Sequence, residues 1–482
     1  MSFKHSASHS QISDGQELNK VLGSRWDLVV IGGGNAAMVA ALSARHLVGR
    51  VLLLERSPIE SRGGNTKHAR NIRCVHETAG AYNTGSYLYD ELWRDLCNVG
   101  EGPSNEKLAA LTVVGSESVP EWMSDHGIRW QPLIRGARHL GRTNRLLLGG
   151  GKALVNAYHS TIVKMGITVL YDALVEDLVI EGNECTGVMV NVAGSGYKVE
   201  AGAVVCASGG FEANLDWLYK YWGDAVENYS IRGDEYNDGI ILKALYAHGA
   251  ASAGQEKGFH AVPVDARSPR FDGGIATRLD TIPFGIVVNR SGQRFYDEGE
   301  VWPKRYAIWG RNIAEQPGQT AYSIWDTKVN TLFLPPMYGP VKANSISELA
   351  RGLSLDERVL CDTVAKYNAS LTGDTIFDPT RLDGLGTTGL NPPKSNWAQR
   401  IDTPPFYGVA MRPGITFTYM GVAVTEEAKV VRTDGSVLSN VFAAGEIMSG
   451  NILSTGYLAG FGLTIGSVWG RIAGKGAANV GA

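Results

Sequence analysis

The chain has 482 residues, of which 44% are hydrophobic and 19% are charged, and its formal net charge is −3. A chain of this length and composition indicates a soluble globular protein of about two domains. The weak negative charge excludes a general attraction to nucleic acid or to anionic membranes, so any basic function must be local.

Cysteine spacing and apolar runs narrow the class further. Five scattered cysteines without a CxxC pair argue against a zinc or iron–sulfur site, and we expect no metal. The first 25 residues have no apolar signal-peptide core. No run approaches the ~20 apolar residues of a membrane-spanning helix. We therefore expect a cytoplasmic protein that meets a membrane, if at all, through a partner.

The first predicted elements form a nucleotide-binding signature. The apolar run from Leu28 to Ile31 predicts a buried parallel strand. The sequence GGGNAA (32–37) follows and satisfies GxGxxA. A helix is predicted over 38–47, and a second strand over 51–54 ends at Glu55.

Each part of this signature has a physical role. Gly32 makes the tight turn, Gly34 lets backbone N–H groups approach a pyrophosphate, and Ala37 allows close packing of helix on strand. Glu55 lies 21 residues after Gly34, where a carboxylate can accept hydrogen bonds from ribose hydroxyls. These features together predict a bound dinucleotide rather than a simple glycine-rich turn.

Two basic clusters follow in the chain. SRGGNTKHARNIRCVH (61–76) joins a glycine pair to several cations, and RGARHLGRTNR (135–145) places four arginines and a histidine within eleven residues. Planar guanidinium groups match carboxylates bidentately, so the clusters predict a di- or tricarboxylate ligand. A solvated basic face is the alternative interpretation.

Later segments complete the predicted architecture. AVVCASGGF (203–211) predicts a further strand, and the C-terminal part predicts a strand over 441–444, a turn at Gly445-Glu446 and a helix over 462–473. A helix N-terminus at that place can stabilise charge on a reduced flavin, which favours FAD over NAD. The Pro-rich, aromatic-rich segment between them reads as an insertion. The predicted division is 1–257 and 416–482 for the FAD-binding domain and 258–415 for a cap.

The motifs resemble those of the fumarate reductase/succinate dehydrogenase flavoprotein superfamily over nearly the whole chain. The stretches that carry the resemblance are IGGGNAA, RGGNTKHARNIRCVH, RTNRLLLGGGKALVNAY and NILSTGYLAGFGLTIG, and they look most like the tricarballylate dehydrogenase branch. The resemblance implies an α/β fold: a Rossmann-like FAD-binding domain of the GR2 type with an inserted α+β cap that carries substrate residues.

The resemblance implies non-covalent FAD, because Asn65 stands where some members have the linking histidine; His68 nearby is the residue that could change this. The residues expected to bind FAD are Gly32, Gly34, Asn35, Ala36, Ala37, Glu55, Arg56, Gly63, Gly64, Asn65, Thr66, Ser208, Gly209, Gly445, Glu446, Gly462, Leu463 and Thr464.

The implied reaction is oxidation of a C–C single bond of a di- or tricarboxylate, of the tricarballylate to cis-aconitate type, with hydride transfer to flavin N5. Arg305 is the expected proton carrier and Tyr457 the alternative, because Trp302 occupies the position of the family's arginine. The residues expected to bind substrate are His68, Arg70, Arg73, His139, Arg142, Arg145, His260 and Arg412.

Three other functions remain open. GYLAGFGLTIG also resembles 3-ketosteroid dehydrogenases, which predicts a flavin desaturase acting next to a ketone, such as a cyclic oxo acid. A fumarate reductase-type enzyme and an accessory electron-transfer flavoprotein are the others. An arginine-lined pocket favours the carboxylate enzyme, and an apolar pocket with two tyrosines favours the ketone enzyme. The implied electron acceptor is a membrane-bound protein with iron–sulfur and haem groups.

Overall fold

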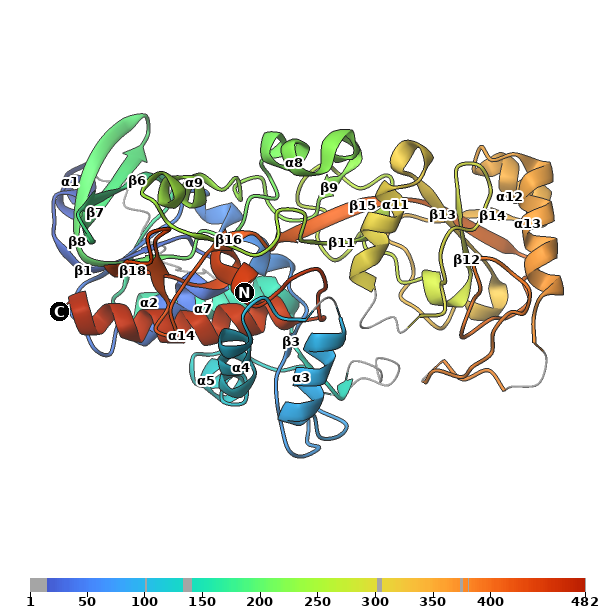
Figure 1. The fold of residues 1–482 in the computed structure, drawn as a ribbon, viewed down its shortest axis with the longest axis horizontal. Helices are drawn as coiled ribbons and strands as arrows, with labels where there is room; N and C mark the ends of the chain where they lie inside the picture. Colours follow the sequence, from blue (N-terminus) through green and yellow to red (C-terminus); the bar gives the residue numbers. More distant parts are fainter. Residues whose placement is uncertain are drawn as a thin grey trace, which may run out of the picture.

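In the computed structural model, which describes residues 15–99, 102–132, 141–300, 306–372, 376–379 and 381–481, two lobes lie side by side (Figure 1). One lobe contains the predicted nucleotide-binding segments around a large sheet. The other lobe contains most of the predicted insertion. The long strand β15 (Phe406–Thr418) runs from one lobe into the other.

The large sheet has a parallel centre. Its strands follow the order β17 (Lys429–Val431), β18 (Val437–Ala443), β8 (Ser195–Cys206), β1 (Trp26–Ile31), β2 (Val51–Leu54) and β5 (Thr168–Leu170), and β7 (Glu184–Val192) pairs with both β8 and β6 (Ala173–Glu181). The pairs from β18 to β5 are parallel. Leu28–Ile31 and Val51–Leu54 are at most 4% exposed, as expected for strands with both faces covered.

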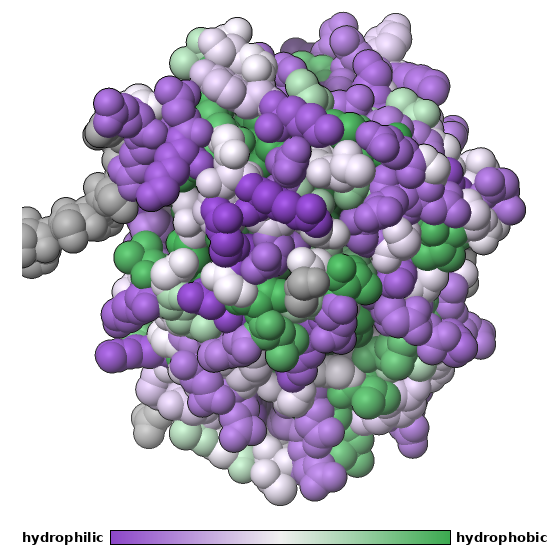
Figure 2. Space-filling view, turned by 90° about the vertical axis from the view of Figure 1, so that its left-hand side faces the viewer, coloured by the Kyte–Doolittle hydropathy of each residue, from purple (hydrophilic) through white to green (hydrophobic). Residues whose placement is uncertain are grey.

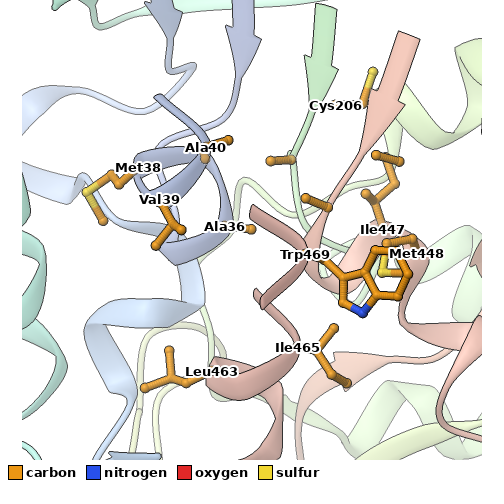
Figure 3. Close-up of a cluster of buried hydrophobic side chains, with 14 of the residues drawn as sticks. Ala36, Met38, Val39, Ala40, Cys206, Ile447, Met448, Leu463, Ile465 and Trp469 are labelled. Carbon is orange, nitrogen blue, oxygen red and sulfur yellow. The ribbon is translucent and has the colours of Figure 1, made fainter. Parts of the chain in front are cut away.

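Two helices pack closely along this sheet and set the position of the cofactor end. They are α2 (Asn35–Ala44) and α14 (Phe461–Gly481). A Cβ on Gly470 would lie 2.7 Å from the Ala36 carbonyl oxygen, and one on Gly474 would lie 2.3 Å from that of Ala40. These glycines therefore let the helices meet backbone to backbone, beside the apolar cluster of Figure 3. The helix predicted over 462–473 is shorter than the observed α14. Its glycines pack against α2 and do not end the helix.

The second lobe is built on an antiparallel sheet. Its strand order is β11 (Phe259–Asp265), β15, β13 (Ala321–Asp326) and β12 (Ile286–Asn289), and β14 (Val341–Ala343) and the short β9 (Ser230–Ile231) also pair with β15. Helices α12 (Ile346–Gly352) and α13 (Glu357–Ala369) cover one end. Phe259 pairs with Thr418, so β11 begins beside the end of β15. The predicted boundaries at 258 and 415 lie beside this pair.

The remaining elements surround the two sheets. They are α1 (Gly15–Leu22), β3 (Asn71–Arg73), α3 (Tyr89–Asn98), α4 (Glu106–Gly115), α5 (Val119–Asp125), β4 (Asn144–Leu146), α7 (Gly150–Lys164), α8 (Leu215–Trp222), α9 (Ile240–Ala247), β10 (Ser252–Ala253), α11 (Trp309–Ala314) and β16 (Gly421–Val422). None of the helices in the described ranges is long and apolar enough to cross a membrane. On the face shown in Figure 2, hydrophilic side chains predominate and hydrophobic ones form small separate groups.

Candidate active site

A single cavity connects the nucleotide-binding motif with the start of the second lobe. Its wall includes the carboxyl ends of β1, β2, β8 and β18, the first turns of α2 and α14, and residues of β11 and β15. Ligands of open α/β folds bind at this edge of a parallel sheet.

The glycine turn after β1 forms one end of the cavity. Gly32 has φ +111°, and a Cβ there would lie 2.4 Å from the Ala207 carbonyl oxygen, so only glycine fits. Gly34 caps α2 without a side-chain hydrogen bond. Glu55 faces the turn, with its Oε2 atom 2.4 Å from where a Gly33 Cβ would stand. Burial raises the pKa of Glu55, and its Oε1 atom accepts a hydrogen bond from the Ser57 N–H at 2.7 Å.

Three arginines line the other end of the cavity. They come from separate segments: Arg70 follows the glycine pair, Arg232 follows β9, and Arg278 precedes η4 (Ile282–Phe284). Arg278 pairs with Asp280 at 2.8 Å. Arg70 and Arg232 have no carboxylate partner within 4 Å among the described residues, which leaves two cations unpaired.

Arg232 is the most buried of these cations. It is 4% exposed, its Nε donates to the Gly274 carbonyl at 3.1 Å, and its Nη1 is buried without a hydrogen-bond partner in the described chain. Burial, followed by repulsion from Arg278, lowers its pKa to about 10. A buried cation without a partner is costly. Its position at the cavity therefore indicates that an anionic ligand completes it.

Aromatic side chains form the wall next to the arginines. His260 Nε2 is 3.2 Å from Tyr306 Oη, and His260 Nδ1 is 3.0 Å from Thr416 Oγ1. The ring of Tyr457 lies 4.1 Å from that of His260, centroid to centroid. Burial, together with Arg232 and Arg278, lowers the pKa of His260 well below its usual value, so the imidazole is neutral at pH 7.

Comparison with known proteins identifies the fold and the cofactor. A family model described as "FAD binding domain" matches residues 27–463. The chain belongs to this FAD-binding family. It is an FAD-dependent oxidoreductase, and the predicted Rossmann-like FAD domain with a cap is confirmed, as is the superfamily.

Curated relatives are enzymes of more than one specificity. The chain is 27% identical over 442 residues to NADH:fumarate oxidoreductase of Klebsiella pneumoniae, which covers 88% of this chain and 44% of that protein. It is 25% identical over 483 residues to fumarate reductase (cytochrome) of Shewanella frigidimarina, covering 94% and 77%. It is 26% identical over 529 residues to 3-oxosteroid 1-dehydrogenase of Mycobacterium tuberculosis, covering 88% and 92%. The chain thus spans less than half of the first relative.

Two solved structures share the fold. The open conformation of a flavocytochrome c3 fumarate reductase has a TM-score of 0.74 at 21% identity and covers 97% of this chain and 81% of that one. The 3-ketosteroid-delta4-(5alpha)-dehydrogenase of Rhodococcus jostii has a TM-score of 0.70 at 22% identity, covering 94% and 97%.

The cavity suits FAD in shape and chemistry. Its N–H groups at the start of α2 and the glycine turn can receive a pyrophosphate. The Asn35 side chain ties the two helices together, because its Nδ2 donates to the Leu463 carbonyl and to Ser467 Oγ, while its Oδ1 is buried without a partner in the described chain. Most of the predicted FAD residues line the cavity, namely Gly32, Gly34, Asn35, Ala36, Glu55, Arg56, Gly64, Asn65, Thr66, Ser208, Gly209, Gly445, Glu446, Gly462 and Leu463.

Three predicted FAD residues lie behind the wall instead. Ala37 is fully buried in the core. Gly63 has φ +104°, and a Cβ there would lie 2.6 Å from a methyl group of Val155, so its role is in the turn. The Thr464 hydroxyl donates to the Arg73 carbonyl. At these three positions the residues support the cavity wall and do not line the cavity.

Four of the predicted substrate residues lie outside the cavity wall in the structure. Arg73 is 1% exposed and donates to Tyr87 Oη at 2.8 Å, 3.6 Å from a carboxylate oxygen of Asp95. Arg142 forms a two-fold hydrogen bond with Glu91 at the surface. Acidic residues of α3 thus hold these two arginines, because the helix packs beside β3.

The other two arginines are held by neutral groups. Arg145 Nε donates to Asn83 Oδ1 at 2.9 Å, and Arg412 Nη2 donates to the Ser268 carbonyl at 2.5 Å. Neither lines the cavity. His68, Arg70, His260 and Tyr457 do line it. His139 and Arg305 lie outside the described residues.

A pair of carboxyl groups stands behind the cofactor end. Glu446 lines the cavity, and Glu212 is fully buried beside it. A Cβ on Gly210 would lie 2.4 Å from Glu446 Oε1 and 2.8 Å from Glu212 Oε2, so both groups converge there. Burial raises the pKa of Glu212 to about 7 and that of Glu446 also upward, and two such close acids cannot both ionise readily.

Sequence reasoning missed Arg232, Arg278 and Tyr306. Arg232 stands in IRGDEYNDG (231–239), a stretch of charges and glycines whose residues 234 and 236–239 also line the cavity. That density of turn-forming and charged residues was an available signal. For Arg278 and Tyr306 no local motif exists, since tertiary contacts place them: Arg278 forms a β-bridge with Val264 of β11, and Tyr306 hydrogen-bonds to His260.

Proposed function

We propose that the chain oxidises a C–C single bond of a di- or tricarboxylate, of the tricarballylate to cis-aconitate type. The observation that supports this best is the arginine cluster of Arg70, Arg232 and Arg278 in the cavity that most of the predicted FAD-binding residues line. A cluster with two unpaired cations selects a ligand with at least two negative charges.

The arginines bind and orient the acid. Each guanidinium presents parallel N–H groups that fit one carboxylate bidentately. Because Arg70, Arg232 and Arg278 come from three segments, a ligand that engages them all is fixed in both position and rotation. Such fixing supplies a large part of the catalytic effect by orienting the reacting bond.

The reaction also requires a hydride acceptor and a proton acceptor. FAD, when bound, takes the hydride. The proton must go to a side chain of the cavity wall, and His260, Tyr306 and Tyr457 are the described candidates. Arg305, the carrier expected from the sequence, stays a proposal.

A ketone substrate is the second candidate, and one contact favours it. Tyr457 Oη lies 3.0 Å from the Gly462 N–H, so a hydroxyl and a backbone donor stand together in the cavity. Two such donors can polarise a ketone oxygen. The relative from Mycobacterium tuberculosis is named for a 3-oxosteroid. The three arginines are superfluous for that substrate, which is why the carboxylate function comes first.

Electrons from reduced FAD need an acceptor. We propose a membrane-bound protein with iron–sulfur or haem groups. Among the described residues, no group of three or more His, Cys, Asp or Glu could hold a metal ion. A relative of 25% identity is named a cytochrome-type fumarate reductase, which supports a haem acceptor.

Anaerobic bleaching of the flavin tests the function. The FAD-loaded protein is mixed with tricarballylate, succinate, citrate, a cyclic oxo acid and a 3-oxosteroid, and the flavin absorbance is followed. We expect bleaching by a carboxylate that has adjacent CH groups. Bleaching by the steroid alone would establish the ketone function, and bleaching by none, with fumarate reoxidising chemically reduced enzyme, would indicate a fumarate reductase-type enzyme.

A further inference from the structure

A tyrosine and a histidine form a hydrogen-bonded pair beside the arginine cluster. Tyr306 and His260 are each 5% exposed, both line the cavity, and Tyr306 Oη lies 3.2 Å from His260 Nε2. A neutral imidazole donates from one ring nitrogen and accepts at the other. His260 Nδ1 can therefore donate to Thr416 Oγ1, 3.0 Å away, while Nε2 accepts from Tyr306.

Cations face this pair from two sides. The Arg278 guanidinium lies over the Tyr306 ring, 5.2 Å from its centroid. Arg232 and Arg278 are the charges that, after burial, keep a proton off His260. The titratable side chain of Tyr457 also lies beside the imidazole. Asp280 pairs with Arg278 and, like Arg73, acts electrostatically on Tyr306, to which Arg70 is also close; Glu446 acts on Tyr457.

We propose that Tyr306 and His260 are the proton relay of the reaction, and that the relay becomes competent only when carboxylates of the substrate lie on Arg232 and Arg278. This inference rests on the proposed function, because the substrate must supply those carboxylates. Substrate binding and activation of the base are then the same event.

The step balances in protons and electrons. A C–H bond of the substrate breaks and its proton passes to Tyr306 Oη, while the hydroxyl proton of Tyr306 passes to His260 Nε2. FAD, when bound, would supply the hydride acceptor for the neighbouring carbon, so the substrate would lose two hydrogens and two electrons and gain a C=C bond. For the reverse reaction the same pair returns the proton to carbon.

The charge around His260 before and after substrate binding explains why the relay needs the substrate. Without a substrate anion, Asp280 offsets part of the charge of Arg278 and no described carboxylate pairs with Arg232, so a proton on His260 would add a buried positive charge beside these two cations. A substrate carboxylate on each guanidinium cancels that repulsion and attracts positive charge. The protonated imidazole is therefore stabilised, and the pKa of His260 rises. Binding of a dianion must then be linked to proton uptake.

Calorimetry with malonate tests this linkage. Malonate is a dianion without two adjacent CH groups, so it can bind but cannot be dehydrogenated. Its binding enthalpy to the FAD-loaded protein is measured near pH 6.5 in PIPES and in imidazole, whose ionisation enthalpies differ, and the difference gives the protons taken up. We expect net uptake by wild type and none by His260→Gln. His248→Gln, outside the cavity wall and paired with Asp177 in wild type, is the matched control and should keep the uptake.

The outcomes separate the relay from the function. Malonate binding without proton uptake, or uptake that persists in His260→Gln but vanishes in His68→Asn, overturns the relay while leaving the carboxylate function intact. Failure of malonate to bind, together with no bleaching by any acid, overturns both. If His260→Gln does not retain FAD, Arg232→Met is measured instead: it should take up less than wild type, because one of the two repelling cations is already gone.

Kinetics test the tyrosine. Tyr306→Phe should lower the rate of flavin reduction by about 100-fold or more, the usual contribution of general acid–base catalysis. Its affinity for malonate should change less than about threefold, because binding uses the arginines. Tyr158→Phe, buried in α7 outside the cavity wall, is the control and should reduce flavin at the wild-type rate. A Tyr306→Phe variant that reduces flavin normally excludes Tyr306 as the proton carrier.

Discussion

Replacement of Arg232 by methionine should weaken substrate binding and strengthen the fold at the same time. Arg232 is 4% exposed, has one hydrogen bond to a carbonyl and has no carboxylate partner in the described chain. A charge-assisted pair with a substrate carboxylate is worth ~1.5–3 kcal/mol, so its loss should raise KM about 10- to 150-fold. Removing an uncompensated buried cation should stabilise the substrate-free protein by roughly 1–3 kcal/mol.

The assay combines steady-state kinetics with thermal unfolding of the FAD-loaded protein. Arg142→Met is the matched control: it removes a half-exposed arginine paired with Glu91, and we expect an unchanged KM and a loss of stability of less than ~1 kcal/mol. Arg232→Lys keeps the charge but lacks the bidentate fork, so its KM should lie between those of wild type and Arg232→Met. An Arg232→Met variant with unaltered KM, or one that is less stable than wild type, would refute the reasoning.

Three further predictions concern the cofactor, the helices and pH. FAD should stay in the supernatant after acid precipitation, because Asn65 holds the place of the linking histidine; colour in the pellet would show a covalent bond. Gly474→Val should destabilise the protein by several kcal/mol, since its Cβ would lie 2.3 Å from the Ala40 carbonyl oxygen. Gly435→Val is the control: nothing lies within 4 Å of its Cβ, and its φ of +83° should cost only ~1–2 kcal/mol. Equal losses of stability would contradict the packing argument. The pKa of His260 is lowered in the folded state, so as pH falls through about 6.5 the unfolded chain binds a proton at this histidine and the folded chain does not. The free energy of unfolding of wild type relative to His260→Gln should therefore decrease as pH falls from about 7.5 to 5.5. A constant difference in urea titrations would argue against a neutral His260.

The nucleotide end was predictable because backbone geometry dictates its residues. At Gly32 a side chain would collide with Ala207, and Glu55, which follows β2, faces the same turn at Gly33. Such constraints act within one strand–turn–helix unit, so a single sequence contains them. Of the predicted cofactor residues, Ala37, Gly63 and Thr464 do not line the cavity, although each is next to a lining residue in the sequence.

The substrate end was only half predictable, because clustering in sequence is a poor guide to clustering in space. Arg73 and Arg142 belong to dense basic stretches, yet Asp95 and Glu91 of α3 neutralise them. Arg232 stands alone in sequence and reaches the cavity through the pairing of β9 with β15. The useful criterion is therefore the missing partner: a basic residue marks a ligand site when the fold buries it and supplies no carboxylate.

That criterion also gives the two lobes a joint purpose. Arg70 belongs to the FAD-binding lobe, whereas Arg278 and Tyr306 belong to the segment between β11 and β15, and His260 stands where β11 leaves the flavin lobe. A carboxylate ligand that contacts Arg70 and Arg278 bridges segments whose cations otherwise repel one another. The same charge neutralisation also makes His260 able to hold a proton. Binding and base activation would then share one cause, so a ligand that engages only one of these arginines should bind weakly and, once bound, react slowly.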